Sequence, residues 1–197
     1  MIGSFIATDF VEPPWGAPVD VEGTLREIPP TATLAGMFLA PIAQEARRRG
    51  GSLPSARERY LPFGFYPVTE HVRLLVEASE LLFPGKSLRI ALRMFGRATP
   101  QAMLASTLGR VTLGTAGGVH EAIAAMVQTY PINLKPSHAE IIASDHHSVV
   151  IRLAEVWFFL DSNHVGIFEG TMRFAGVKGQ VRVCKRSASE ADFLCTW

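Results

Sequence analysis

The chain has 197 residues, of which 48% are hydrophobic and 19% are charged, and its formal net charge is +1. This composition is typical of a compact folded protein and excludes an intrinsically disordered one. The near-zero charge gives no general attraction to nucleic acid or acidic membranes, and no apolar run reaches the roughly 18 residues that a membrane-spanning helix needs.

The first residues of the chain lack basic side chains and do not resemble an export signal, so we expect a cytoplasmic protein. Residues 1–19 are predicted to form an N-terminal arm, and residues 20–197 a single domain. Within that domain we expect a helical part over 34–130 and a sheet part over 137–197.

Apolar residues recur at helical spacing through most of the helical part. Five helices are predicted, over 34–50, 67–83, 88–97, 99–113 and 117–130. Thr99 as an N-cap and Pro100 at the first helical position predict the start of the fourth helix, and Pro131 predicts the end of the fifth. The segment 20–28, before these helices, is predicted as a strand.

After residue 136 the sequence is rich in β-branched and aromatic residues, which favours strands. The predicted elements are strands at 138–143 and 148–159, a helix within 161–177, and a terminal hairpin of strands 180–185 and 192–197. Asn163 or Ser162 is the expected N-cap of that helix, and Gly176 the expected residue just past its C-terminal end. The fold class is therefore α+β, with a helical block packed on an antiparallel sheet that one helix interrupts.

The two cysteines lie in the two strands of the predicted hairpin. Side chains alternate between the faces of a strand. If Val181 and Val183 face the core, Cys184 points away from it, whereas Cys195 faces the core together with Phe193. We therefore expect two free thiols.

The predicted helix within 161–177 carries Gly166 and Gly170 one turn apart, with Glu169 between them. Each glycine costs roughly 1 kcal/mol of helix stability relative to alanine. The pair therefore indicates that a sheet or a ligand approaches this helix closely. Two roles stay open for Glu169: an ion pair with Arg173 one turn later, or a contact with a ligand or partner.

Three further motifs give weaker indications, and no catalytic signature accompanies them. Of the segment 144–147, only Asp145 and His147 share a strand face, so a polar hairpin turn is expected there rather than a metal site. The glycine-rich segment 109–120 lacks the Lys-Ser/Thr ending of a phosphate-binding loop. The five arginines between Arg47 and Arg59 suit a solvated helix end and loop, with phosphates or an acidic partner as the alternative.

Several segments resemble a paralogous family of myxobacterial proteins of about this length and of unknown function. They are LAGMFLAPI (34–42), YPVTEHVRLLVEASELLFPGKSLRIALRMFGR (66–97), VWFFLDSNHVGIFEGTMRFAGV (156–177) and DFLCTW (192–197), in the same order and spacing. The resemblance runs from about residue 20 to the end of the chain. It implies a myxobacterial origin and an α+β fold, but no activity and no catalytic residues.

The order of helices followed by a sheet with an inserted glycine-containing helix resembles haem-based nitric-oxide-binding domains and vinyl-reductase-like ligand-binding domains. In the haem domains a histidine shortly before a Tyr-Pro pair ligates the iron, which points to His120 ahead of Tyr130 and Pro131, although about one helical turn farther away. Those domains also hold the haem propionates with Tyr, Ser and Arg on the strand before the helix, whereas the segment 155–163 has no arginine. The resemblance implies a ligand-binding fold with haem as the candidate cofactor.

Large apolar side chains are abundant where the helices should meet the sheet, which favours an apolar pocket with few polar groups. We expect a sensory or regulatory module that binds a hydrophobic small molecule there and passes occupancy to a protein partner or within a homodimer. The residues expected to contact the ligand are Tyr66, Trp157, His164, Gly166, Glu169 and Gly170.

Three alternatives to this expectation remain. The first is an enzyme acting on an apolar substrate, with Glu169 or His164 as the acid or base. The second is a structural interaction protein, in which Gly166 and Gly170 admit a neighbouring protomer. The third is a haem-based gas sensor with His120 as the iron ligand.

Overall fold

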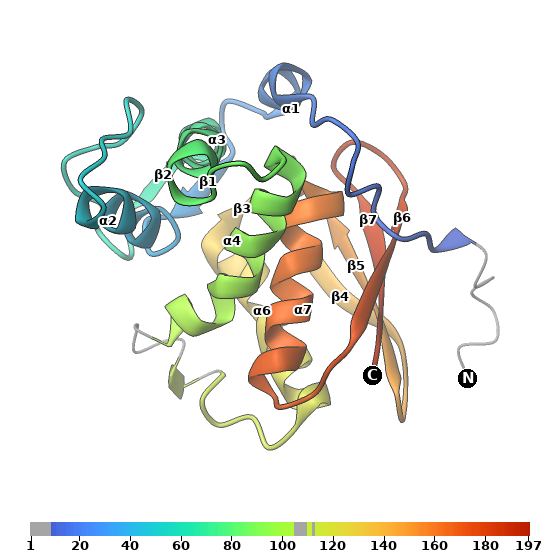
Figure 1. Ribbon diagram of the computed structural model, residues 1–197. Coiled ribbons are helices and arrows are strands. Elements are labelled where there is room, and N and C mark those ends of the chain that lie inside the picture. The colour runs from blue at the N-terminus through green and yellow to red at the C-terminus, as the bar shows by residue number, and fades with distance from the viewer. Residues whose placement is uncertain (1–8, 105–109, 112) are drawn as a thin grey trace.

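The computed structural model describes residues 9–104, 110–111 and 113–197, which form six α-helices and two antiparallel sheets (Figure 1). The helices are α1 (Val21–Glu27), α2 (Ala40–Arg48), α3 (Val68–Leu82), α4 (Leu88–Met103), α6 (Val119–Asn133) and α7 (Val165–Phe174), and a π-helical turn, η2 (Leu160–His164), leads into α7. The strands are β1 (Thr33–Ala35), β2 (Phe65–Pro67), β3 (Leu134–Lys135), β4 (His138–Asp145), β5 (Ser148–Ala154), β6 (Gln180–Lys185) and β7 (Ala191–Thr196). The expected α+β class is confirmed.

The elements form two lobes that meet at α4 and α6. One lobe contains α2, α3 and a small sheet in the order β2-β1-β3, and the other contains a sheet in the order β4-β5-β7-β6 with α7 packed on it (Figure 1). Leu34 of β1 lies opposite both Tyr66 of β2 and Leu134 of β3. Because β3 directly continues α6, this small sheet joins the first lobe to the second. None of the described helices is long and apolar enough to cross a membrane.

The four-stranded sheet confirms the expected strands of the C-terminal part. Val181 pairs with Cys195 and Val183 with Phe193, and these four side chains are buried. Cys184 lies on the other face and is half-buried. The two thiols are free, as strand parity predicts.

The segment 20–28 was predicted as a strand but contains helix α1. The side chain of Asp20 accepts a hydrogen bond of 2.8 Å from the backbone N–H of Gly23, and the hydroxyl of Thr24 donates to the Asp20 carbonyl over 2.7 Å. Asp20 thus caps a helix whose apolar residues are too few to show a helical period.

Proline does not interrupt the helices where the sequence predicted breaks. Pro100 lies inside α4, which is one helix where two were expected, and Pro131 lies in the last turn of α6. A proline removes one helical hydrogen bond, and the packing of α4 along α7 outweighs this loss. The end of the predicted helix 99–113 and the start of the glycine-rich segment 109–120 include residues 105–109 and 112, which lie outside the described residues.

The boundaries of β5 and α7 follow from backbone conformation. The strand predicted over 148–159 ends at Ala154 because Glu155 has a φ of 57°, and Phe159 also has a positive φ, of 46°. Helix α7 ends at Phe174, and Gly176 lies just past its end as expected, with a φ of 81° and an N–H that donates to the Arg173 carbonyl over 3.0 Å. Asn163 was an expected N-cap, but its side chain donates instead to the Leu92 carbonyl of α4 over 3.1 Å.

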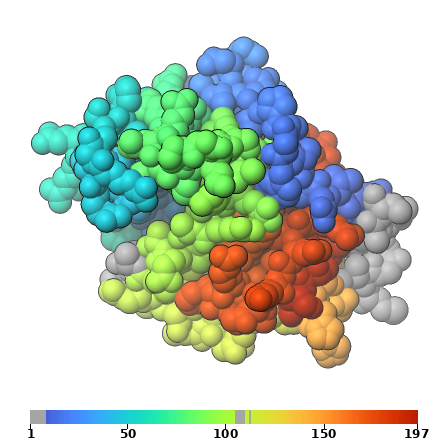
Figure 2. Space-filling model, viewed as in Figure 1, coloured from blue at the N-terminus to red at the C-terminus, as the bar shows by residue number. Residues whose placement is uncertain are grey.

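The described part of the N-terminal segment packs against the second lobe. Phe10 is buried, and Val11 forms a backbone bridge with Val183 of β6. The guanidinium of Arg93 stacks on the ring of Trp15, with 3.9 Å from its central carbon to the ring centre. Figure 2 shows this blue segment along the border between the green α4 region and the red terminal strands.

Helices α4 and α7 approach each other so closely that three positions have no room for a side chain. A Cβ atom on Gly166 would lie 2.2 Å from the Arg93 carbonyl oxygen, and one on Gly170 would lie 2.5 Å from the Arg97 carbonyl oxygen. On α4, a Cβ on Gly96 would lie 2.0 Å from the Asn163 carbonyl oxygen. The group that approaches the predicted glycine pair is therefore a neighbouring helix, neither a sheet nor a ligand.

We predict that Gly166→Ala and Gly170→Ala each lower the free energy of unfolding by about 1–3 kcal/mol, because the new methyl group meets backbone and the overpacking outweighs the gain in helix propensity. Urea denaturation measures the change. Gly16→Ala is the matched control, since nothing lies within 4 Å of its Cβ, and it should stay within about 0.5 kcal/mol of the parent. Equal stability of all three variants would contradict the packing described.

Candidate ligand-binding cavity

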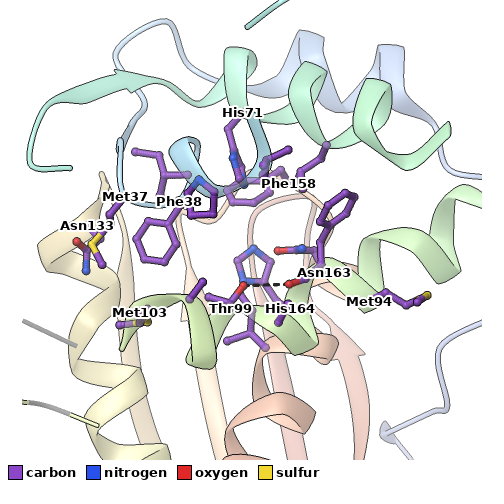
Figure 3. Close-up of a pocket in the computed structure, with 18 of the residues that line it drawn as sticks. Met37, Phe38, His71, Met94, Thr99, Met103, Asn133, Phe158, Asn163 and His164 are labelled. Carbon is purple, nitrogen blue, oxygen red and sulfur yellow. Dashed lines mark hydrogen bonds between the residues drawn. The ribbon is translucent and has the colours of Figure 1, made fainter. Parts of the chain in front are cut away.

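A cavity of about 410 Å³ lies between the two lobes (Figure 3). It is bounded by β1, α2 and α3 on one side and by α4, α6, η2 and α7 on the other. Most of its lining is apolar, including Met37, Phe38, Leu75, Phe95, Met126 and Phe158. The cavity therefore lies where the two lobes face each other without filling the space between them.

Several polar side chains of the lining form hydrogen bonds with nearby backbone. Thr129 donates its hydroxyl to the Met126 carbonyl over 2.6 Å, and the amide of Asn133 donates to the Thr129 carbonyl over 2.9 Å. Asn163 is bonded to Leu92 of α4 as described above. These groups are already satisfied without a ligand.

Two histidines of the lining differ from these groups. His71 comes from α3 and His164 from the end of η2, and the ring of Phe158 lies beside both, with centroids 5.4 Å from His71 and 4.9 Å from His164 (Figure 3). Nδ1 of His71 and Nε2 of His164 are buried and have no hydrogen-bond partner among the described residues. A buried polar atom without a partner costs roughly 1–3 kcal/mol, so the fold tolerates two destabilising groups at this cavity.

Both histidines are neutral at physiological pH. Burial lowers the pKa of His71 to about 3. Burial also lowers the pKa of His164 to about 3, and the neighbouring His71 adds to the effect. The cavity consequently contains imidazole rings rather than imidazolium cations.

The hydroxyl of Tyr130 lies 2.9 Å from Nδ1 of His164. Tyr130 is buried in α6, its ring stacks on that of Phe168 at 6.2 Å, and burial raises the pKa of its hydroxyl far above the usual value. The phenol therefore stays protonated and acts as a hydrogen-bonding group beside His164.

The charged residues at the edge of the cavity neutralise each other. Glu45 of α2 accepts hydrogen bonds from Arg48 and from Arg49, the latter over 3.0 Å, and the bond from Arg48 is the main reason that the pKa of Glu45 falls to about 2. In the predicted basic segment, Arg57 is likewise paired with Glu70 over 2.9 Å. Much of the segment between Arg47 and Arg59 is thus engaged within the protein.

Of the six residues expected to contact the ligand, His164 alone is among those that line this cavity. Gly166 and Gly170 lie against α4 instead. Glu169 is buried between Arg93 and Arg97 of α4, bonded to both, with 2.8 Å from Arg97 Nε to its Oε2. Of the two roles left open for Glu169, the ion pair with Arg173 is wrong, because Glu169 faces α4 and pairs there with Arg93 and Arg97.

The other expected contacts lie elsewhere. The hydroxyl of Tyr66 accepts a hydrogen bond of 2.9 Å from the Leu61 N–H, and Trp157 lines a separate groove near α1. His120 sits in the first turn of α6 with its Nε2 2.7 Å from the Asp145 carbonyl oxygen, outside the cavity lining.

The segment 144–147 forms the expected hairpin turn between β4 and β5. The carboxylate of Asp145 accepts hydrogen bonds of 3.0 Å from the backbone N–H of His147 and from the hydroxyl of Ser148. No group of three or more histidine, cysteine, aspartate or glutamate side chains able to hold a metal occurs in the described parts of the chain.

Sequence reasoning did not identify His71 or Tyr130. A signal for His71 does exist: it falls three residues after Val68 and four before Leu75, on the apolar stripe of the helix. A polar residue on a core-facing stripe is unusual enough to mark a candidate site. For Tyr130 no such signal exists, because its partner lies 34 positions later in the sequence.

Residues 30–197 match the model of DUF2378, a family of proteins of unknown function. The chain belongs to this family. No curated protein matches it significantly.

Several solved structures share the fold. An H-NOX protein from K. algicida, described as Fe(II) unliganded, has a TM-score of 0.61 at 14% identity, covering 83% of this chain and 96% of that one. A mutant H-NOX protein from S. oneidensis has a TM-score of 0.65 at 10% identity, covering 83% and 95%. A third structure, described in terms of haem redox potential and porphyrin distortion, has a TM-score of 0.60 at 14% identity, covering 82% and 97%. The fold of this chain is therefore H-NOX-like.

The two buried histidines predict a loss of stability at mildly acidic pH. Their pKa values of about 3 in the folded protein lie below the ordinary 6.5, so the unfolded chain binds more protons between these values. This contribution to stability is complete above pH 6.5 and is lost as the pH falls. For each histidine, the free energy of unfolding should fall by about 1 kcal/mol when the pH is lowered from 6.5 to 5.5.

Urea denaturation at the two pH values measures this loss, and His71→Phe should reduce it by about half. An exposed histidine gives the matched control, since His146→Phe should leave the pH dependence unchanged. If His71→Phe has the parent's pH dependence, the imidazole is not neutral and buried as described.

Proposed function

We propose that this protein binds an apolar small molecule in the cavity between its lobes and acts as a sensory or regulatory module. The observation that carries the proposal is the cavity itself, with about 410 Å³ of space, a mainly apolar lining and two buried histidine nitrogens that find no hydrogen-bond partner in the described part of the chain. Ligand sites in proteins are typically concave and mainly apolar, with a few placed polar groups. The H-NOX-like fold of the chain is consistent with a ligand-binding role.

Haem is the first ligand to consider because the structural neighbours are described with Fe(II) and haem, but the residues of this cavity do not fit it. From α6, the residues that face the cavity include Met126 and Tyr130, whereas His120 lies outside it. Arg49, the one arginine or lysine that the described residues contribute to the lining, is already bonded to Glu45. Two haem propionates would therefore lack the free cations that compensate their charge, and we favour an uncharged ligand.

Helix α4 offers a route by which occupancy reaches the surface. Phe95 and Thr99 on this helix line the cavity, while Arg93 on the same helix stacks on Trp15 of the N-terminal segment. A ligand that binds more tightly to one relative position of the two lobes shifts the equilibrium toward that position, and α4 and the N-terminal segment then move together. The segment is then the proposed point of contact with a protein partner or a second copy of the chain.

The alternatives weighed for Glu169 and the glycines have less support. Glu169 is bonded to two arginines away from the cavity, and His164, with a pKa of about 3, is a weak general base at neutral pH. The space beside Gly166 and Gly170 is filled by α4, which leaves no room there for another protomer.

Binding of N-phenyl-1-naphthylamine, a neutral fluorophore that brightens in apolar surroundings, tests the proposal. We expect saturable binding to the purified protein, and a loss of affinity of about tenfold or more in Ala102→Phe, which places a ring in the cavity. Gln101→Phe is the control, because this neighbouring residue of α4 is exposed and does not line the cavity, and it should bind as the parent does. The proposal fails if no saturable binding occurs, or if both variants behave alike.

An absorption spectrum of protein expressed with a supply of haem separates the two ligand classes. We expect no stoichiometric Soret band, for the reasons of charge given above. A stoichiometric band that disappears in His164→Phe but persists in His120→Phe would overturn the assignment of an apolar, uncharged ligand and place haem in this cavity.

A further inference from the structure

The hydrogen bond between Tyr130 and His164 determines which nitrogen of the imidazole carries the proton. The Tyr130 hydroxyl is buried, and Nδ1 of His164 is its hydrogen-bond partner among the described residues. If the phenol donates to Nδ1, one buried group stays unsatisfied, the Nε2–H. If Nδ1–H donates to the phenol instead, two groups are left over, the phenolic proton and the Nε2 lone pair.

The first arrangement is favoured because each unsatisfied buried group costs free energy. The backbone carbonyl of Phe158 also interacts with the ring and acts to raise its pKa, but it does not form a hydrogen bond with Nε2. A neutral imidazole whose Nδ1 accepts a hydrogen bond carries its proton on Nε2. His164 therefore offers a single N–H donor, fixed in direction by Tyr130, in the wall of an otherwise mainly apolar cavity.

This donor restricts the chemistry of the ligand. An oxygen acceptor on the ligand satisfies the Nε2–H, whereas a pure hydrocarbon leaves it without a partner. A carboxylate would need a compensating charge, but His164 is neutral and Arg49 is already paired. The remaining class is a neutral, mainly apolar molecule with an oxygen acceptor. A carbonyl oxygen is such an acceptor and, unlike a hydroxyl, brings no further donor that needs a partner.

We propose that the cavity is selective for neutral apolar carbonyl compounds, whose oxygen accepts a hydrogen bond from Nε2–H of His164 while Tyr130 holds the donor tautomer in place. This inference rests on the proposed function, since it names the class of ligand for the same cavity. His71 is also buried beside the Phe158 ring, but its Nδ1 has no hydrogen-bond partner among the described residues, so none of them fixes its tautomer through that nitrogen.

The tautomer can be tested without a ligand. Long-range ¹⁵N–¹H correlation spectra of protein labelled with ¹⁵N-histidine report which ring nitrogen carries the proton. At neutral pH, His164 should carry its proton on Nε2. Its signals are assigned as those that disappear in His164→Phe. In Tyr130→Phe, which removes only the hydroxyl, the two tautomers should become mixed. A proton on Nδ1 of His164 in the parent protein would overturn the inference.

The selectivity can be tested with two probes of equal length, 2-undecanone and undecane, which displace N-phenyl-1-naphthylamine. We expect the ratio of ketone to alkane affinity to fall about tenfold in His164→Phe and by a smaller factor in Tyr130→Phe. His71→Phe tests the other histidine of the lining as the anchor. His120→Phe, at a histidine outside the cavity lining, is the matched control and should keep the parent ratio. Decanoate, which bears a charge, should compete more weakly than the ketone.

The outcomes separate the two proposals. If the fluorophore does not bind the parent protein, the proposed function fails. If it binds and is displaced, but the ratio is the same in the parent, His164→Phe and His71→Phe, then the cavity binds apolar molecules without the selection proposed here. A fall in the ratio for His71→Phe alone would place the polar anchor at the other histidine and would also overturn the inference.

Discussion

The close contact between α4 and α7 is the constraint on which the rest of the structure depends. At Gly96, Gly166 and Gly170 the two backbones lie so close together that a methyl group would not fit between them. The distance between the helices is therefore fixed. The carboxylate of Glu169, buried between Arg93 and Arg97, fixes the helices lengthwise through charged hydrogen bonds. Because one face of α4 is held in this way against α7 and the second lobe, its opposite face points toward α2 and α3.

The cavity is a consequence of this arrangement. Helix α4 belongs to the second lobe by its contact with α7, yet its other face must also serve as a wall for the first lobe, which is attached through β1 and β3. Two independently packed units rarely have fully complementary surfaces, and a gap at their junction stays open when no large side chain crosses it. Ala98 and Ala102 on α4 are small at this wall. Flexible Met37, Met103 and Met126 line the same space and suit an irregular guest.

Much of this architecture could be predicted from periodicity, whereas of the site only an apolar pocket and His164 could. Helix α3, the four C-terminal strands and the end of α7 shortly before Gly176 follow from patterns that each lie within one element. Two elements were predicted wrongly for other reasons. Asp20 caps α1 through a local hydrogen bond, which outweighs a sequence pattern typical of a strand. Pro100 is tolerated inside α4 because α7 packs along that helix. The pair of Tyr130 with His164 depends on residues far apart in sequence, which no local pattern encodes.

The contact between α4 and α7 also determines how His164 is presented. The π-helical turn that holds His164 begins after Phe159, whose left-handed backbone is costly for an aromatic residue and needs support from its surroundings. Part of that support comes from α4: the Asn163 carbonyl sits over Gly96, and the Asn163 amide donates to the Leu92 carbonyl. A side chain at Gly96 would displace Asn163 and with it the adjacent imidazole. The residues that align the two helices thus also position the imidazole of His164, whose tautomer Tyr130 determines. Helix packing and the proposed ligand recognition therefore depend on the same few backbone contacts.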